Sequence, residues 1–217
     1  MREIVVLVHG LWISHFILDW LARRLQKCGF QAVKFNYSSV HANISDNAQL
    51  LHAFTRDLQV EKVHFVGYSL GGLVIIQMFQ DFPQQRPGRI VLLGTPYTGS
   101  YVAHRLARYG VWCRLFGQSL EKALLGQGPA WSGARELGVI AGTLPFGGSL
   151  LTVPSLPRPH DGAVSVEETR VPGMTDHITL RVSHFGLVIA RAVAQQVCDF
   201  LKSGRFTGGA NSARSGP

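Results

Sequence analysis

A serine between two glycines is the first feature of this chain that could do chemistry. Residues 64–74 read HFVGYSLGGLV, so Ser69 stands between Gly67 and Gly71 in the pattern G-x-S-x-G. A serine hydroxyl becomes a useful nucleophile when a neighbouring base removes its proton. Because the chain has 24 glycines in 217 residues, the pattern alone does not identify a nucleophile. Its position in the fold and the presence of partner residues have to decide.

A histidine that can act as the base follows the last predicted strand. Of the nine histidines in the chain, His184, in RVSHFG, comes directly after that strand, where a loop can reach back to Ser69. His64 lies within a predicted strand and is expected in the core, His177 is at the opposite end of the last strand, and His9 is expected to be a structural hydrogen-bonding residue. We therefore predict His184 as the base.

The third group of such a site is an acid that orients the imidazole and stabilises its protonated form. Four carboxylates lie between the fifth predicted strand and the base: Asp161, Glu167, Glu168 and Asp176. Asp161 follows a Pro-rich loop and precedes a glycine, so a tight turn can present its carboxylate. Glu167 and Glu168 are adjacent charges that we expect to face solvent, and Asp176 resembles an ordinary turn residue before a strand. We predict Asp161 as the acid.

Two backbone amides are predicted to stabilise the oxyanion that forms on nucleophilic attack. One is the N–H of Leu70, directly after the predicted nucleophile. The other comes from the loop HGLWIS after the first predicted strand, where Leu11 is the preferred donor and Trp12 the alternative. Such donors matter because the loss of one typically costs about a hundredfold or more in rate.

Strand and helix patterns alternate along the chain. Continuous apolar or β-branched runs predict strands at 3–9, 31–37, 62–68, 89–95, 136–143 and 177–183. Helical patterns lie at 15–30, 43–59, 69–82 and 185–203. The alternation predicts an α/β fold with a mostly parallel six-stranded sheet and helices on both faces. Ser69 then lies at the carboxyl end of the third strand, the edge of such sheets where reactive groups gather.

The chain is predicted to form a single domain over residues 1–203, followed by a disordered tail at 204–217. Two stretches interrupt the alternation: a mixed helical insert at 97–132 and a Pro- and Gly-rich loop at 144–160. The insert carries six apolar residues that either form a lid over an acyl pocket or pack on the sheet, and the sequence leaves both alternatives open. They are Val102, Leu106, Trp112, Leu115, Phe116 and Leu124.

The formal net charge of +8 comes mainly from scattered arginines. No basic stripe interleaved with aromatic residues is present, so nucleic-acid binding is not expected. We interpret the positive charge first as a solvated face. Contact with anionic lipid head groups or acidic substrates is the alternative, and if the insert is a lid, its arginines would direct it to an anionic lipid surface.

Cysteine usage and apolar runs leave a cytoplasmic location as the default expectation. Cys28, Cys113 and Cys198 are widely spaced and odd in number, so they predict neither a disulfide framework nor a metal site and are interpreted as small core residues. No apolar run reaches the roughly 18 residues that span a bilayer. The first residues resemble a buried strand rather than a signal peptide, and a cytoplasmic location is the default expectation.

Five segments together resemble the α/β-hydrolase superfamily: VLVHGLW, VGYSLGGLV, LLGTPYTGS, DGAVS and SHFGLV. Within it, the chain is most similar to the compact bacterial lipases and esterases and to the PGAP-like (GPI-inositol deacylase-like) lipase relatives, from residue 4 to about residue 202. The resemblance implies Ser69 as nucleophile, Asp161 as acid, His184 as base, and Leu11 with Leu70 at the oxyanion hole. It also implies no metal and no organic cofactor.

These residues predict a serine hydrolase that cleaves carboxylic esters, of small molecules or lipids, through an acyl-enzyme. An acyltransferase or a thioesterase with the same triad is an alternative, because water, alcohols and thiols compete for one acyl-enzyme. A non-catalytic binding protein on the same fold is a third possibility. Intact Ser69, Asp161 and His184 disfavour it, since nothing structural requires all three.

Overall fold

Six parallel strands form the centre of the protein. The computed structural model describes residues 3–11, 15–107, 123–146 and 156–207. The strands lie in the order β2-β1-β3-β4-β5-β6, and every neighbouring pair is parallel. Their bounds are β1 Glu3–Val8, β2 Gln31–Phe35, β3 Lys62–Tyr68, β4 Ile90–Leu93, β5 Leu137–Gly142 and β6 Asp176–Leu180. The predicted mostly parallel six-stranded sheet is confirmed.

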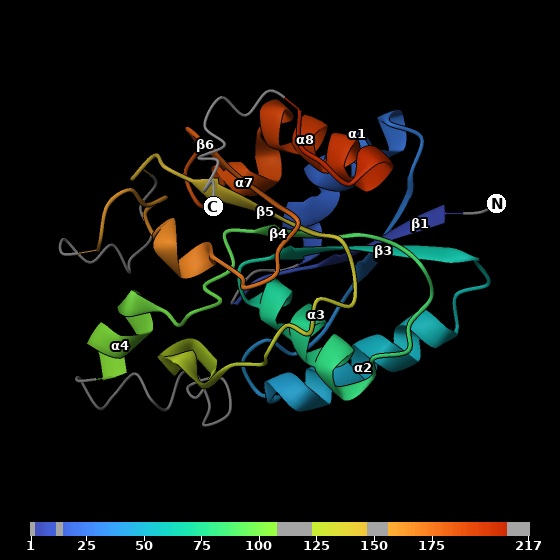
Figure 1. Ribbon diagram of the computed structural model, residues 1–217, viewed down its shortest axis with the longest axis horizontal. Helices are drawn as coiled ribbons and strands as arrows, with labels where there is room; N and C mark the ends of the chain where they lie inside the picture. The colour runs from blue at the N-terminus through green and yellow to red at the C-terminus, as the bar shows by residue number, and fades with distance from the viewer. Residues whose placement is uncertain (1–2, 12–14, 108–122, 147–155, 208–217) are drawn as a thin grey trace, which may run out of the picture.

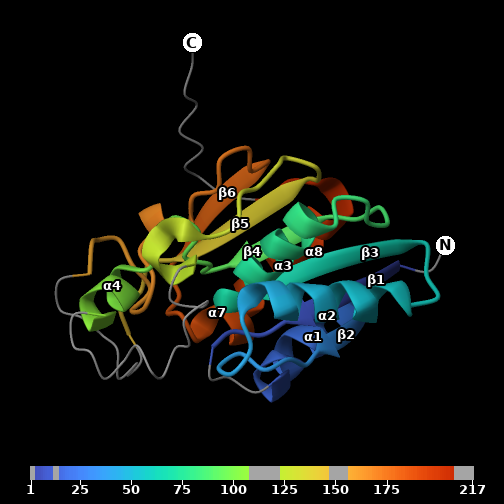
Figure 2. The same cartoon turned by 90° about the horizontal axis from the view of Figure 1, so that it is seen from below.

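Helices cover both faces of the sheet. The described helical segments are η1 His15–Leu18, α1 Asp19–Lys27, α2 Ile44–Arg56, α3 Leu70–Asp81, α4 Tyr101–Ala107, η2 Ala123–Gln127, η3 Glu167–Thr169, α7 Gly186–Ile189 and α8 Arg191–Ser203. In Figure 1, α1, α7 and α8 lie above the sheet, and α2 and α3 lie below it; Figure 2 shows the same layers from below. Each connection between successive strands contains at least one helical segment, since parallel neighbours need crossover connections and these usually carry helices.

Alternation along β1 explains the two cores. Val5 and Leu7 belong to the core cluster under α1 and α8, whereas Ile4, Val6 and Val8 belong to the cluster under α2 and α3. Successive side chains of a strand point to opposite faces, so a strand covered on both faces needs apolar residues at every position. The uninterrupted run IVVLV meets that requirement.

Two predicted helices are divided in the structure. The predicted helix 15–30 begins with the 3₁₀ turn η1 and ends at Lys27. The predicted helix 185–203 is interrupted at Ala190, whose extended backbone (φ −70°, ψ 137°) separates α7 from α8. The guanidinium of Arg24 on α1 donates to the carbonyl of Ile189 at this break, and so satisfies a carbonyl at the end of α7.

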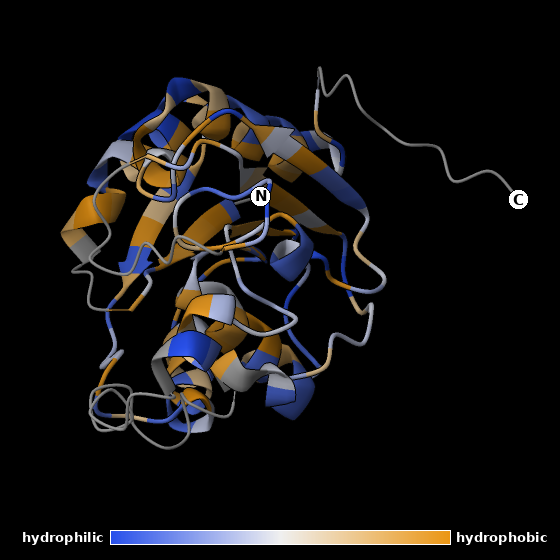
Figure 3. Ribbon diagram, turned by 90° about the vertical axis from the view of Figure 1, so that its left-hand side faces the viewer, coloured by the Kyte–Doolittle hydropathy of each residue, from blue (hydrophilic) through white to orange (hydrophobic). Residues whose placement is uncertain are grey.

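The segments α4 and η2 of the insert lie at the edge where the strands end, on the side that faces the viewer in Figure 3. Ala130 and Trp131, also in the insert, contact Gln80 and Phe79 near the C-terminal end of α3. Leu124 is buried in a cluster with Ile44, Leu70 and Leu73, and Val102 is also buried. These two residues pack against the rest of the fold. Trp112, Leu115 and Phe116 lie outside the described residues, as does the side chain of Leu106.

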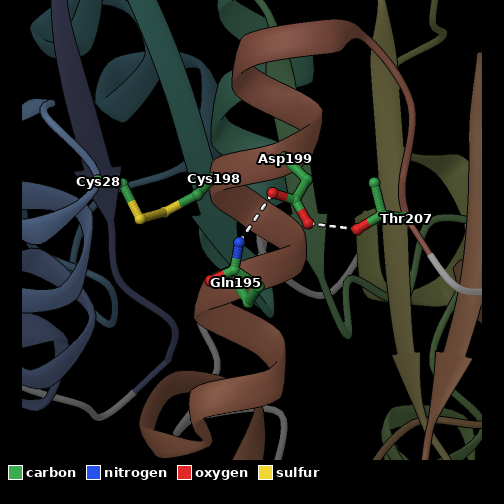
Figure 4. Close-up of a disulfide and its surroundings, with 5 residues drawn as sticks. All are labelled: Cys28, Gln195, Cys198, Asp199 and Thr207. Carbon is green, nitrogen blue, oxygen red and sulfur yellow. Dashed lines mark hydrogen bonds between the residues drawn. A yellow bond between two sulfur atoms is a disulfide. The ribbon is translucent and has the colours of Figure 1, made fainter.

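A disulfide joins Cys28, at the end of α1, to Cys198 on α8 (Figure 4). The two Cα atoms are 6.3 Å apart and 170 positions apart in the sequence. The interpretation of all three cysteines as separate core residues is therefore wrong for these two. Wide spacing in the sequence gave no sign of the pairing, because α1 and α8 become neighbours only when both pack on the same face of the sheet. Cys113 lies outside the described residues.

The first four residues of the tail predicted at 204–217 are ordered in the structure. Gly204 ends α8 in the left-handed conformation, and its N–H donates to the carbonyl of Phe200 at 2.8 Å. The ring of Phe206 lies 4.8 Å from that of Phe200, and its N–H donates to Asp176 at 2.9 Å. Thr207 donates to Asp199 (Figure 4). Residues 204–207 are thus held against the fold, and the rest of the predicted tail lies outside the described residues.

Within the described ranges, no helix has both the length and the apolar character to cross a membrane.

We expect the Cys28–Cys198 bridge to contribute about 2–4 kcal/mol to the free energy of unfolding, because it restricts a long segment of the unfolded chain. Urea unfolding of a Cys28→Ala/Cys198→Ala variant should show that loss, and Cys113→Ala serves as the control that keeps the bridge. Unfolded without reductant, the wild-type protein should present one reactive thiol of its three cysteines. Three reactive thiols under that condition would contradict the pairing.

Candidate active site

Ser69 occupies a strained turn between β3 and α3. Its backbone (φ 53°, ψ −122°) has the single positive φ found at a non-glycine position among the described residues. Conformations of this kind cost about 1–3 kcal/mol and persist where the surroundings hold them. The Ser69 N–H donates to the carbonyl of Leu93 at 2.8 Å, and the Ser69 carbonyl accepts from the N–H of Gly72 at 3.1 Å and from the hydroxyl of Thr95 at 3.0 Å. Hydrogen bonds on both sides therefore hold the residue.

The glycines of the motif are required by close backbone approach. A Cβ atom at Gly71 would lie 2.3 Å from the carbonyl oxygen of Val8 and 2.5 Å from that of His9. A Cβ atom at Gly67 would lie 2.6 Å from the Cα atom of Gly72. The end of β1 and the start of α3 can approach this closely only without side chains there. The G-x-S-x-G pattern therefore lies at a sharp strand-to-helix turn.

Asp161 and His184 form a hydrogen-bonded pair. Oδ2 of Asp161 is 2.7 Å from Nδ1 of His184, and the backbone N–H of His184 donates to the Asp161 carbonyl at 2.9 Å. The other carboxylate oxygen accepts from the N–H groups of Ala163, at 2.9 Å, and Val164, at 2.8 Å. The Asp161 side chain is 1% exposed. With its Nδ1 proton directed to the carboxylate, the imidazole retains Nε2 as a proton acceptor.

The acid–base pair lies beside the Ser69 turn. Gly94 follows Leu93, whose carbonyl binds the Ser69 N–H, and a Cβ atom at Gly94 would lie 3.1 Å from Cε1 of His184. The ring of Tyr68 is 5.0 Å from the imidazole. Among the described residues, no hydrogen bond joins the Ser69 hydroxyl to His184; in ligand-free sites such contacts often tighten only when substrate binds.

On one side, the acid–base pair borders the buried ring of Tyr68. Burial, and to a smaller extent the charge of Asp161, raises the pKa of the Tyr68 phenol above its ordinary value. The buried phenol ring packs beside the imidazole. His184 itself is accessible, with 17% of its side chain exposed, and Ser69 is half-buried.

The predicted oxyanion donors lie close to one another. Leu70 is the first residue of α3, so its N–H belongs to the turn whose amides lack carbonyl partners within the helix. Leu11 packs against the cluster that contains Leu70. A Cβ atom at Gly10 would lie 3.0 Å from the Cβ atom of Ser69, so the loop after β1 runs along the nucleophile turn. Trp12, the alternative donor, lies outside the described residues. The role of both amides stays a prediction.

Of the other carboxylates considered, Glu168 differs most from expectation. Glu167 is exposed, but Glu168 is buried and accepts hydrogen bonds from the N–H groups of Tyr101 and Ser165, each at 2.5 Å. The expectation that it faces solvent is wrong, because the turn η3 directs the two adjacent acids to opposite sides. Asp176 begins β6 and lies at the other end of that strand from the candidate site.

Two other histidines have structural contacts. His64 is buried, and its Nδ1 accepts the N–H of Arg89 at 3.0 Å. Burial lowers the pKa of His64, although the hydrogen bond with Glu3 opposes the shift. His9 is buried and stacks on Tyr37 with ring centroids 4.3 Å apart. His64 is thus a core histidine, as predicted. Nδ1 of His9 lies 2.9 Å from the carbonyl oxygen of Gly10, in agreement with its predicted role as a structural hydrogen-bonding residue. In the part of the chain that the structure describes, no group of three or more His, Cys, Asp or Glu residues is arranged to hold a metal ion.

Comparison with known proteins gives structural neighbours but no close relative in sequence. No family model and no curated protein matches the chain. The mature Bacillus licheniformis lipase BlEst2 is similar with a TM-score of 0.74 and 22% identity, over 93% of this chain and 91% of that one. The metagenomic carboxyl esterase MGS0156 has a TM-score of 0.70 and 16% identity, over 84% of this chain and 64% of that one.

A bromoperoxidase from Bacillus anthracis is also similar, with a TM-score of 0.61 and 14% identity, over 93% of this chain and 92% of that one. Identities this low show the architecture rather than the activity. The chain has the α/β-hydrolase fold.

Proposed function

We propose that the protein is a serine hydrolase that cleaves carboxylic esters through an acyl-enzyme on Ser69. The observation that carries the proposal is the 2.7 Å hydrogen bond between Asp161 and His184, next to the strained turn that bears Ser69. A carboxylate that orients an imidazole beside a serine is the arrangement that activates a serine hydroxyl. The fold is shared with structures of a lipase and a carboxyl esterase, which supports the same class of reaction.

In the proposed reaction, Nε2 of His184 takes the Ser69 proton as Oγ forms a bond to the ester carbonyl carbon. The negative charge that develops on the carbonyl oxygen is stabilised by the N–H groups of Leu70 and Leu11. The imidazolium then gives its proton to the leaving alcohol as the ester C–O bond breaks. Water repeats the sequence on the acyl-enzyme, releasing the carboxylic acid and restoring the Ser69 hydroxyl. Asp161 stays ionised throughout and stabilises the imidazolium.

A fluorophosphonate probe tests the nucleophile directly. We expect the wild-type protein to be labelled, Ser69→Ala not to be labelled, and His184→Ala to react at least about 10³-fold more slowly, since the hydroxyl then lacks its base. Rates are measured from the time course of fluorescence on denaturing gels. An unlabelled wild-type protein, or Ser69→Ala labelled as fast as wild type, would contradict the hydrolase proposal.

The acid is tested by Asp161→Asn, with the exposed Glu167→Gln as the matched control. We expect kcat on p-nitrophenyl esters to fall about 10³–10⁴-fold in Asp161→Asn, because an amide favours the wrong imidazole tautomer and does not stabilise the imidazolium. The control should retain wild-type kcat. Near-full activity in Asp161→Asn would assign the acid to another residue.

A lipid surface is the partner that we propose for this enzyme. The groove between α1 and α8 is lined by four basic side chains and one exposed tryptophan: Arg23, Arg24, Lys27, Arg191 and Trp20. The Arg24 guanidinium lies 5.8 Å from the centroid of the Trp20 ring. Exposed aromatic side chains with clustered basic residues favour contact with anionic head groups. The insert arginines expected to serve this contact are not needed for the proposal.

Vesicle flotation tests the lipid contact. We expect binding to vesicles that contain phosphatidylglycerol, weak binding to pure phosphatidylcholine, and about thirtyfold weaker binding for Arg23→Gln/Lys27→Gln, since each basic residue near the surface contributes about 1 kcal/mol. Arg56→Gln/Lys202→Gln removes the same charge from exposed positions elsewhere and should bind as wild type. Equal loss in both double variants would reduce the effect to net charge and contradict a specific groove.

The cytoplasmic location expected from the sequence stays a prediction. The Cys28–Cys198 bridge argues for an oxidising compartment instead, because disulfides are rare where thiols are kept reduced. An oxidising compartment is compatible with the proposed chemistry, which uses no cysteine. The thiol count proposed above, made on protein alkylated in intact cells, distinguishes the two locations.

A further inference from the structure

The hydroxyl of Thr95 contacts the backbone of the proposed nucleophile. Thr95 follows β4 by two residues and is fully buried. Its Oγ1 donates to the carbonyl oxygen of Ser69 at 3.0 Å. That oxygen also accepts the N–H of Gly72 at 3.1 Å, the contact expected in the first turn of a helix. The bond from Thr95 is therefore an additional constraint that comes from a different element of the fold.

Peptide geometry links this contact to the proposed oxyanion hole. The carbonyl of Ser69 and the N–H of Leu70 belong to one peptide group, which is planar and trans. The two groups point in opposite directions, so a hydrogen bond that fixes the direction of the carbonyl also fixes that of the N–H. Because the buried Thr95 binds the Ser69 oxygen, the Leu70 N–H of the same peptide points away from this threonine.

Gly72, which has no side chain, leaves room for the hydrogen bond between Thr95 and Ser69. A Cβ atom at Gly72 would lie 2.1 Å from Oγ1 of Thr95 and 2.8 Å from its Cγ2. Any other residue at this position would displace the threonine from the Ser69 carbonyl. The close approach of the glycine and the threonine is therefore what permits the hydrogen bond.

The hydrogen bond from Thr95 restrains the strained backbone of Ser69. A residue at φ 53° tends to relax toward common backbone conformations, and relaxation rotates both of its peptide groups. The Leu93 carbonyl restrains the preceding peptide through the Ser69 N–H, at 2.8 Å. The Thr95 hydroxyl restrains the following one. Two residues at the end of β4, Leu93 and Thr95, thus hold both peptide groups that flank the nucleophile.

We propose that Thr95 is a positioning residue for the reaction: through the Ser69 carbonyl, it keeps the Leu70 N–H directed at the developing oxyanion. The inference rests on the proposed hydrolase function. It concerns a residue that does not touch substrate and acts only through the nucleophile peptide. The hydroxyl, rather than the volume of the side chain, carries the effect.

Thr95→Val keeps the shape of the side chain and removes the donor. Loss of a whole oxyanion donor typically costs about 10²–10³ in kcat, and a misdirected donor costs part of that. We expect kcat on p-nitrophenyl esters to fall about tenfold with KM within about twofold. Inhibition by a boronic acid, which bonds to the serine oxygen as a tetrahedral anion, should weaken by a similar factor, since the adduct places its negative oxygen in the same site. Thr95→Ser should restore both values.

Thr55→Val is the matched control. Thr55 is 3% exposed, and its hydroxyl donates to the carbonyl of His52 at 2.8 Å on α2. Its loss removes a comparable buried hydrogen bond outside the candidate site and should leave kcat and boronate affinity unchanged. Should Thr95→Val not fold, Thr95→Ser and Thr95→Ala differ from each other by the hydroxyl alone and give the same comparison.

Three results would overturn the inference: a kcat in Thr95→Val within twofold of wild type, equal losses in Thr95→Ser and Thr95→Val, or equal losses in Thr55→Val and Thr95→Val. Each would show that the hydroxyl does not act through the oxyanion donor. These outcomes are distinct from failure of the proposed function, in which the wild-type protein itself neither reacts with the fluorophosphonate nor hydrolyses the ester.

Discussion

The positive φ of Ser69 is the constraint on which the candidate site depends. A serine held in this conformation projects from the end of β3 at the start of α3, and it stays there because neighbouring segments hold it on several sides. The carbonyl of Leu93 and the hydroxyl of Thr95 bind its two peptide groups. Gly10 and Gly71 let the end of β1 and the loop after it lie against the turn. Three adjacent strands of the sheet therefore fix one residue.

The acid–base pair is built differently, from loops that hold one another. Asp161 is fixed by two amides of its own turn. The backbone N–H of His184 binds the Asp161 carbonyl, and the His184 ring binds the Asp161 carboxylate. The same loop is tied to the insert, since buried Glu168 accepts from Tyr101 at the start of α4 and from Ser165. A movement of α4 would therefore be transmitted to the loop that carries the acid.

The sequence could predict what depends on local pattern. Uninterrupted apolar runs such as that of β1 identify strands buried on both faces, and G-x-S-x-G after such a run identifies the turn at Ser69. Asp161 and His184 follow from chain order relative to the strands, and the structure brings the two into contact. Residues whose environment depends on distant packing were not predictable. Cys28 and Cys198 meet because α1 and α8 share a face. Glu168 binds the N–H of Tyr101 on α4, and Phe206 contacts Phe200 and Asp176.

The contact between Gly72 and Thr95 depends both on local sequence pattern and on the packing of distant segments. Each is unremarkable in its own segment: a second glycine after the serine motif, and a threonine after a strand. Together they form one contact, in which the missing side chain of the first makes room for the hydroxyl of the second. A single sequence cannot reveal such a pair, because neither residue breaks a local rule. Only the parallel pairing of β3 with β4, which sets Tyr68 beside Leu93, brings them together. The direction of the Leu70 amide then depends on β4 as much as on the serine motif itself.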